Sequence, residues 1–334
     1  MRRDVVSKIA PAPTAASLAE AFTARLLFLS SMALLLAFPF LGANEFTVTL
    51  LTEGLIFGIW AMSLDLLAGF TGLMSFGHAS GLGLGAYTAG YFAQHVTSEF
   101  LIALPAAEIV VAVLAVLLGL VVGRISGVAF AIVTLAISQV LLQIGIAWLP
   151  VTGGMDGLIG VPVPTLFGYK LESGESFYLI VAVILILVYL ALVRLANSPF
   201  GHTLQAIRLS EQRAAAIGIN VRLHKCAIFV VSWLVAAIAG TLLVFMKGGT
   251  TPMVFNWYQS GYVLAVTMFG GLRTLLGPLV GAIIVTFLHD QAISLFKAWQ
   301  FVFGLAFVLA VIFFPAGIAG IAIRTWNRLW ESRC

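Results

Sequence analysis

Long apolar runs, separated by short polar segments, recur along almost the whole chain. A helix needs about 20 mostly apolar residues to cross the hydrocarbon core of a bilayer, and shorter runs suffice where neighbours support a broken helix. On this criterion the pattern predicts about ten membrane-spanning helices. We expect them near residues 26–43, 48–68, 79–96, 101–123, 127–149, 177–195, 226–246, 257–272, 275–295 and 300–319. The eighth is short, and the stretch FGGLRTLLGP at its end can form a re-entrant bend.

Composition agrees with this pattern. The chain is 61% hydrophobic and only 9% charged, whereas soluble domains carry roughly 25% charged residues. We therefore expect an all-α polytopic membrane protein, with some helices short or broken. A secretory signal with cleavage near Ala43 is the alternative for the first run. The long polar leader and the many similar runs that follow favour a first spanning helix instead.

The basic residues predict the orientation, because lysine and arginine gather in cytoplasmic loops. With the N-terminus inside, the outer side holds only Lys170, Lys247 and Lys297, and the other 14 of the 17 basic residues lie inside. Both termini are then cytoplasmic, as a tail of residues 1–25 and a tail of residues 320–334 around a transmembrane domain of residues 26–319. Membrane topology thus explains the excess of basic over acidic residues, and we expect no nucleic-acid partner.

Two loops are long enough to have a function. The outer loop, residues 150–176, is punctuated by Gly and Pro, which favours turns over a helix. The inner loop, residues 197–225, predicts a helix from Thr203 to Ile217 that ends with Gly218. This helix either lies on membrane lipid, aided by its arginines, or docks a cytoplasmic partner. The acidic Glu211 favours docking.

A stripe of small residues begins at Gly77 and continues at Gly81, Gly85 and Ala89. A four-residue spacing puts them on one helix face, where small side chains let helix backbones approach closely. Such a helix can also border a pathway that opens and closes, and His78 lies at its start. A similar Gly-Leu turn precedes Gly77 and Gly277, at Gly72 and Gly271, which leaves open an origin from two related halves.

Motifs for chemistry are absent. The sequence contains no phosphate-binding GxxxxGK[ST] loop, no HExxH and no GxSxG, so we expect no enzyme activity and no bound cofactor or metal. Uphill transport would then draw on an ion gradient or on another subunit. A proton-coupled carrier would use carboxylates such as Asp65 and Glu108, since ionisable groups at membrane depth are usually functional. Cys226 and Cys334 belong to no metal or disulfide pattern.

Four segments, in order along the chain, resemble the LivM-type permease family of branched-chain amino-acid ABC importers. They read LDLLAGFTGLMSFGHASGLGLGAYTAGY, TGGMDGLIGVP, SPFGHTLQAIRLSEQRAAAIGINVRLHK and MFGGLRTLLGPLVGAII. The resemblance implies a second, LivH-like permease subunit and a periplasmic solute-binding protein, all at a bacterial inner membrane. Two ATPase subunits would bind ATP and Mg in the cytoplasm. Urea, amides or aromatic acids stay open beside branched-chain amino acids as the imported solute.

The same resemblance suggests which residues matter. For coupling to the ATPase subunits these are Arg208, Glu211, Ala214, Ala215, Gly218 and Ile219. Along the translocation pathway, or at its packing contacts, they are Thr71, Ser75, Gly77, His78, Gly81, Gly85, Gly271 and Gly277. The expected mechanism is alternating access, driven from the inner loop.

Overall fold

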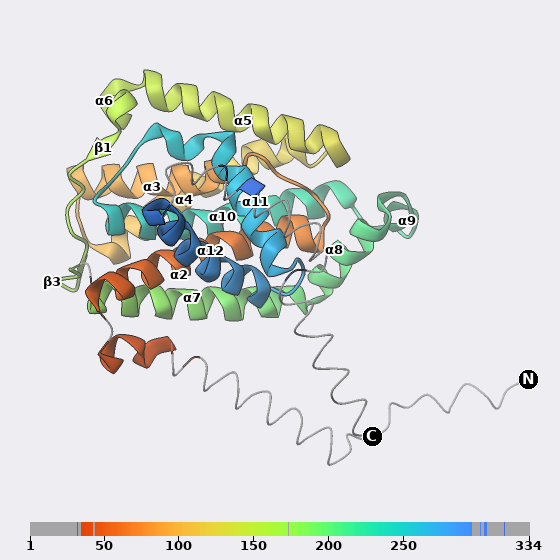
Figure 1. Ribbon diagram of the computed structural model, residues 1–334. Helices are drawn as coiled ribbons and strands as arrows, with labels where there is room; N and C mark the ends of the chain where they lie inside the picture. Colours follow the sequence, from red (N-terminus) through yellow and green to blue (C-terminus); the bar gives the residue numbers. More distant parts are fainter. Residues whose placement is uncertain are drawn as a thin grey trace, which may run out of the picture. The chain divides into compact units, whose positions relative to one another are not determined.

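The computed structural model describes residues 32, 35–42, 44–172, 174–295, 301, 304–305 and 317. The chain divides into two units, Met1–Ala43 and Asn44–Cys334. In the first unit the 3₁₀ turn η1 (Phe38–Leu41) ends at Gly42, which has the left-handed φ of 79°. The second unit contains every element discussed below (Figure 1).

Helices dominate the second unit, and short strands join them at one end. The long helices are α2 (Glu45–Asp65), α3 (His78–His95), α4 (Phe100–Val122), α5 (Gly127–Ala147), α7 (Glu175–Ala196), α10 (Val221–Lys247), α11 (Trp257–Gly270) and α12 (Leu276–Leu295). The short helical elements are η2 (Leu66–Phe70), α6 (Leu149–Thr152), η3 (Gly154–Asp156), α8 (Pro199–Leu209), α9 (Glu211–Ala216) and η4 (Pro252–Phe255). The strands are β1 (Leu158–Ile159), β2 (Thr165–Leu166), β3 (Tyr169–Lys170) and β4 (Gly249–Thr250).

Six helices in the described part of the chain are long and apolar enough to cross a membrane. They correspond to six of the ten expected spans, and the longest of them are α10 and the segment formed by α2 with η2. The expected spans 26–43 and 300–319 lie largely outside the described residues. The glycine-rich α3 is not among the six, and neither is α11, whose 14 residues give about 21 Å of helix. The structure thus supports a polytopic helical membrane protein, without confirming the count of ten.

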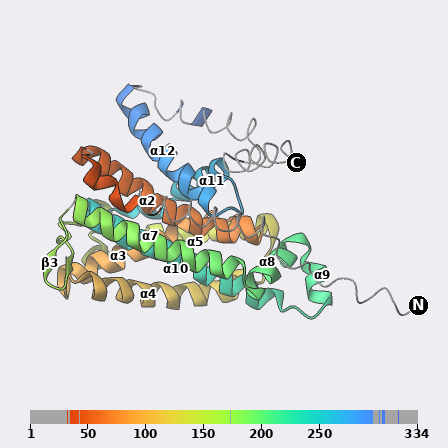
Figure 2. The same cartoon turned by 90° about the horizontal axis from the view of Figure 1, so that it is seen from below.

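Helices α2 and α10 form the centre of the bundle, and α4, α5 and α7 lie outside them (Figure 2). Most of the apolar window of α2 and α10 is buried, whereas α4, α5 and α7 bury less than a third of theirs. A helix that is apolar all round is either enclosed by other helices or faces lipid. The peripheral helices therefore present the surface that lipid or another membrane subunit would cover.

Close packing of α3 on α10 depends on glycines of both helices. A Cβ atom at Gly85 would lie 2.4 Å from the carbonyl oxygen of Ala237, and one at Gly240 only 1.9 Å from that of Leu82. Neither distance leaves room for a side chain. The small residues therefore bring the two backbones into direct contact, which is the usual role of such faces between membrane helices.

The helical pattern is interrupted in two places inside the bundle. Residues 71–77 lead into α3, and residues 251–256 lead into α11. The starts of both helices meet there, since the Ala79 N–H donates to Ser260 Oγ at 2.9 Å. Non-helical backbone at membrane depth is tolerated where protein buries it or where it lines a cavity. The break expected at FGGLRTLLGP instead takes the form of a tight turn between α11 and α12, and the longer irregular segment precedes α11.

Helix α10 connects two ends of the bundle that differ in structure. We call the end with α8, α9 and Lys225 the inner end, and the end with β1, β4 and Lys247 the outer end, following the predicted orientation. At the outer end β1 pairs with β4 in antiparallel register, Leu158 opposite Thr250. Strands β2 and β3 form a β-hairpin. The outer loop is therefore fixed to the segment that follows α10.

Candidate functional site

At the inner end, the expected single helix of the inner loop is divided into two. Pro199 occupies the first turn of α8 and Ser198 caps it, accepting from the Gly201 N–H. Ser210 has extended backbone angles and caps α9 in the same way. A serine side chain competes well for such orphan amides, so Ser210 ends one helix and starts the next. Gly218, at φ +90°, follows the last turn of α9, as the sequence predicts.

A buried lysine joins this helical hairpin to the bundle. Lys225 is only 2% exposed, and its Nζ lies 3.1 Å from Oε1 of Glu211. The same ammonium group donates to the carbonyl of Ile125 and to Ser126 Oγ, both at 2.6 Å. Ser126 Oγ in turn donates to Glu211 Oε2 at 2.7 Å. Glu211 therefore binds its own chain and ties α9 to α10 and to the turn between α4 and α5.

Arg208 provides a second connection, from α8 to the end of α2. Its guanidinium donates to the carbonyl of Gly69 in η2. Burial lowers the pKa of Arg208 from its ordinary value, nearby Arg273 lowers it further, and Asp65 opposes both. Since α8 contacts the backbone of η2, a displacement of α8 would be transmitted to the inner end of α2.

Asp65 organises the turn between α11 and α12. Its carboxylate accepts from the Arg273 N–H at 2.7 Å and from the Leu275 N–H at 3.2 Å. Both residues have left-handed backbones, with φ of 72° and 55°, which non-glycine residues rarely adopt. The side chain of Asp65 is fully buried. This carboxylate therefore binds backbone amides and is not in contact with water.

The remaining residues expected to couple to ATPase subunits are placed differently from one another. Ala214 is buried, Ile219 is half-buried, and Ala215 and Gly218 are exposed. Two large apolar side chains that the sequence did not single out are exposed at this tip: Leu209 at 79% and Ile217 at 76%. We call Leu209, Ala215, Ile217 and Gly218 the hairpin tip. Its two large apolar side chains lie beyond the spanning helices, one on each side of α9.

The expected pathway residues gather in the buried interior. His78 Nε2 lies 2.7 Å from Ser63 Oγ, and Ser75, Gly77, Gly81 and Gly85 are buried around the start of α3. Thr71 bonds back to the carbonyl of Leu67. Gly271 and Gly277 lie in the turn held by Asp65, where the Gly277 N–H donates to Thr274 Oγ1. Most of the expected pathway residues thus lie in one of two places, near the start of α3 where it packs on α10 or in the turn between α11 and α12.

Glu108 lies apart from these groups, half-buried on α4. Its Oε1 has no hydrogen-bond partner in the described part of the chain. Among the described residues there are two ion pairs, Lys225–Glu211 and Lys247–Glu53, and Glu108 is in neither. Within the described part of the chain, no basic group therefore pairs with Glu108.

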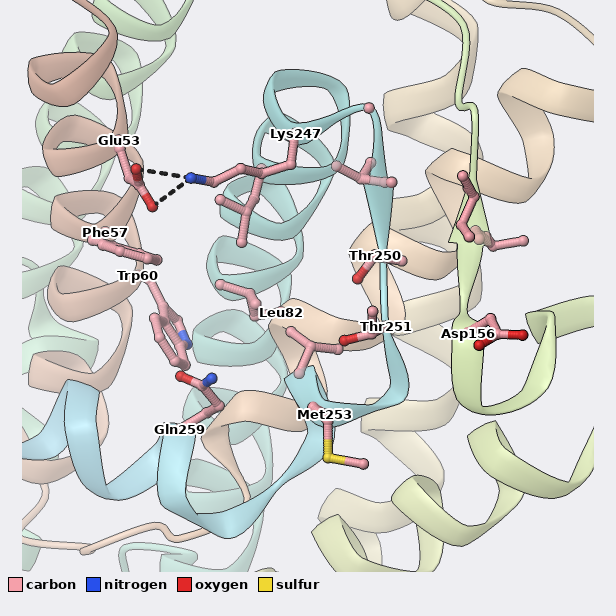
Figure 3. A pocket seen from close by; sticks show the side chains of 17 residues that line it. Glu53, Phe57, Trp60, Leu82, Asp156, Lys247, Thr250, Thr251, Met253 and Gln259 are labelled. Atoms are coloured by element: carbon pink, nitrogen blue, oxygen red, sulfur yellow. Dashed lines mark hydrogen bonds and ion pairs between the residues drawn. The ribbon is translucent and has the colours of Figure 1, made fainter. Parts of the chain in front are cut away.

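A pocket of about 460 Å³ opens at the outer end. Its walls come from α2, α3, α10, α11, η4 and the paired strands β1 and β4. Lys247 and Glu53 form an ion pair of 2.9 Å at one side, and Asp156 lies across from them (Figure 3). Thr250 and Thr251 lie between the ion pair and Asp156 (Figure 3), and Gln259 adds a further polar group. Apart from these and the three charged residues, the lining is apolar. Its side chains include Phe57, Trp60, Leu82, Leu243, Val244, Met253 and Val254.

The sequence did not reveal this pocket. Glu53 and Lys247 are 194 residues apart, and each reads separately as a charge near the outer interface. One signal was present: Gly248 and Gly249 after a lysine allow a sharp reversal at the end of α10. That reversal, with Gly248 at φ 67°, turns the following chain back across the mouth of the pocket.

Comparison with known proteins gives a consistent result. The sequence model of one family, the permease component of branched-chain amino acid transport systems, matches residues 46–313. The high-affinity branched-chain amino acid transport system permease protein LivM of Escherichia coli (strain K12) is 27% identical over 317 residues, with 88% of this chain and 74% of the relative covered. The probable LivM of Methanocaldococcus jannaschii is 29% identical over 229 residues, covering 59% and 66%. The probable LivH of that organism is 29% identical over 175 residues, covering 49% and 53%. No solved structure matches the chain.

Proposed function

This chain belongs to the family of permease components of branched-chain amino acid transport systems, and on that premise we propose that it moves branched-chain amino acids from periplasm to cytoplasm as the permease subunit of an ATP-driven ABC importer. The match over residues 46–313 carries this proposal, because it includes the spanning helices, the hairpin α8–α9 and the pocket together. We place the protein in the bacterial inner membrane, surrounded by lipid.

The proposed assembly divides the work among several chains. A LivH-like permease subunit would complete the pathway, and the likeness of this chain to the probable LivH protein supports a pair of related subunits. Two cytoplasmic ATPase subunits would bind ATP and Mg, and a periplasmic solute-binding protein would supply the amino acid. This chain itself would bind no cofactor and act on no covalent bond.

The hairpin tip supports docking to the ATPase subunits. It offers exposed apolar side chains on a hairpin that Glu211–Lys225 and Arg208–Gly69 fix to the bundle. Movement of the ATPase subunits would therefore reach α10 through Lys225 and α2 through η2. Because α10 and α3 meet through glycines and not through interlocking side chains, the two helices can rock against each other as access alternates.

Neither of the other functions considered from the sequence gains an observation in its favour. Of the carboxylates that a proton-coupled carrier would need, Asp65 caps a turn and Glu108 lies apart from the interior cluster around His78 and Ser63. The relatives named above are all branched-chain amino acid permeases by name, which favours those solutes over urea, amides or aromatic acids.

Co-purification after mild detergent extraction tests the docking. We expect ATPase subunits to accompany the native chain and to be lost with Leu209→Asp plus Ile217→Asp, because both side chains are exposed and their replacement leaves the Glu211–Lys225 network intact. Phe167→Asp is the matched control, since Phe167 is 78% exposed at the outer end. The proposal is contradicted if no ATPase subunit accompanies the native chain, or if both variants retain it equally.

A further inference from the structure

The pocket at the outer end lies directly beside the interrupted part of the bundle. Its lining includes Leu82 of α3, Val254 of η4 and Gln259 of α11. The ring of Phe255, next to Val254, stacks on Tyr87 of α3 at 5.5 Å. Irregular backbone that lines a cavity between membrane helices is a recurring feature of transport sites. The location therefore suits a solute that enters from the outer side.

The two charges at the mouth of the pocket are of opposite sign and belong to different helices. Lys247 is the last residue of α10, where the helix dipole favours a cation, and Glu53 lies on α2. Lys247 is 49% exposed and Glu53 21%. A pair so accessible to water contributes little to stability. It can therefore open and exchange partners at small cost.

The space between the charges matches an aliphatic side chain. Leu82, Leu243 and Val244 face the pocket from α3 and α10, and Phe57 and Trp60 face it from α2. The carboxylate of Asp156 across the pocket (Figure 3) gives the mouth one negative charge in excess. An ammonium group would thus be attracted as well as a carboxylate, and an apolar solute without charges would leave the ion pair unused.

We propose that this pocket is a transient binding site for an α-amino acid with an aliphatic side chain, in which Lys247 binds the α-carboxylate and Glu53 the α-ammonium group. The ligand replaces one ion pair by two, so Lys247 and Glu53 both keep a counter-charge. The inference rests on the proposed function for the identity of the solute. Weak binding suffices, because a solute-binding protein would deliver the amino acid at the mouth.

Trp60 marks the next position along the pathway. Its side chain is 1% exposed, and its indole N–H has no hydrogen-bond partner in the described part of the chain. The ring edge that carries the nitrogen faces the pocket near Gln259 (Figure 3). The start of α11, with its partial positive charge, lies on the same side. As the ligand moves inward, its carboxylate leaves Lys247 and accepts a hydrogen bond from Trp60.

Direct binding to the purified full chain in nanodiscs tests the first position without any other subunit. Saturation-transfer NMR would compare L-leucine with 3-methylbutylamine and 4-methylpentanoate, which lack the carboxylate and the ammonium group respectively. We expect the leucine signal to exceed that of either analogue at least fivefold, and to fall at least fivefold in Glu53→Gln and in Lys247→Met. Lys170→Met, which removes an exposed lysine of the outer loop, is the matched control.

A charge exchange separates binding from a purely structural ion pair. Glu53→Lys combined with Lys247→Glu keeps an ion pair but reverses its direction. We expect leucine binding to stay as low as in the single variants. Recovery of the native signal by the exchanged pair would overturn the proposal, and so would native binding in both single variants.

Uptake by the complete reconstituted importer tests the second position. Trp60→Phe keeps an aromatic ring and removes the donor, so we expect the maximal rate of L-leucine uptake to fall at least threefold while the half-saturating concentration stays constant. Trp233→Phe is the control, because its indole N–H is equally buried and unpartnered among the described residues but does not line the pocket. Equal rates in both variants would contradict the role of Trp60.

The two proposals fail in different ways. If leucine binds the native chain as described but no ATP-driven uptake occurs, the proposed function is wrong and the binding site stands. If the native importer takes up leucine at the same rate as Glu53→Gln and Lys247→Met, the binding site is wrong and the proposed function stands.

Discussion

Helix α10 carries a lysine near each end, and the two lysines have opposite surroundings. At the inner end Lys225 is almost fully buried and reaches Glu211, Ser126 and the carbonyl of Ile125. At the outer end Lys247 is half exposed and bonds Glu53. A buried charge is costly unless each of its hydrogen bonds is made, whereas an exposed pair is readily replaced by water. The inner pair is thus suited to transmit force, and the outer pair to exchange partners.

Removing the charge of Glu211 should have the largest effect. Glu211→Gln leaves the buried Lys225 ammonium without a counter-charge, but the Glu211 side chain is itself 37% exposed, so the cost is below the roughly 3–5 kcal/mol of a fully buried pair. We expect thermal unfolding in detergent to begin at a markedly lower temperature.

The double variant Glu211→Gln with Lys225→Met is the control for that experiment. Because it removes both charges, it should unfold at a higher temperature than Glu211→Gln alone. If the single variant is as stable as the native chain, the inner pair does not anchor the hairpin and the contrast between the two ends disappears.

Asp65→Ala should have the next largest effect. The substitution leaves the buried Leu275 N–H and the part-buried Arg273 N–H of the α11–α12 turn without an acceptor, and an unsatisfied buried donor costs about 1–3 kcal/mol. Hydrogen exchange of the Arg273 and Leu275 amides, followed by mass spectrometry, should become faster. Asp65→Asn keeps one acceptor oxygen and should lie between Ala and the native chain; unchanged exchange in the Ala variant would contradict the capping role.

A smaller effect is expected at Ser126, whose exposed hydroxyl group links the charged side chains of Lys225 and Glu211. Ser126→Ala should cost about 1 kcal/mol, the usual net value of one hydrogen bond. The measurement is again thermal unfolding, with Ser294→Ala as the control, because Ser294 only bonds the carbonyl of Gln291 in its own helix. A loss as large as that in Glu211→Gln would mean that Ser126, and not the ion pair, holds the hairpin.

Lys247→Met should have the smallest effect on stability. Exposed ion pairs contribute about 0–1 kcal/mol, and salt screens them further. We expect the unfolding temperature to change little and to respond little to added salt, although amino-acid binding is lost. A destabilisation comparable to that of Glu211→Gln would assign the outer pair a structural role.

Local hydropathy predicted most helices closely. The expected spans 101–123, 127–149 and 177–195 correspond to α4 (Phe100–Val122), α5 (Gly127–Ala147) and α7 (Glu175–Ala196). Each of these helices is mostly apolar and faces outward, so its boundaries lie close to where runs of polar residues begin. The prediction was poorer at the inner end of α10, which begins at Val221 and not near residue 226, because its first turns contain Arg222, His224 and Lys225, which a hydropathy profile assigns to a loop.

The candidate site was predicted less completely than the helices. The sequence singled out Arg208 and Glu211, but it placed the importance of Glu211 in contact with a partner, whereas its carboxylate faces Lys225 of the same chain. It missed Leu209 and Ile217, since apolar residues in an amphipathic segment are ordinarily assigned to the buried face. Which face of a short helix is buried depends on the break between α8 and α9 at Ser210. That break is set by the φ and ψ angles of Ser210 alone.

The sequence by itself determined that this protein is a polytopic helical membrane protein and which segments resemble an importer permease, and it predicts that the basic loops face the cytoplasm. These properties follow from the composition and from the order of apolar and polar residues, which can be read in each short segment of the chain without the rest. Only the tertiary structure decided that Lys225 meets Glu211, that Asp65 caps a turn more than 200 residues away, and that Glu53 and Lys247 face one pocket. Such pairs depend on how α2, α3 and α10 approach each other, and close packing of backbones at Gly85 and Gly240 sets that approach.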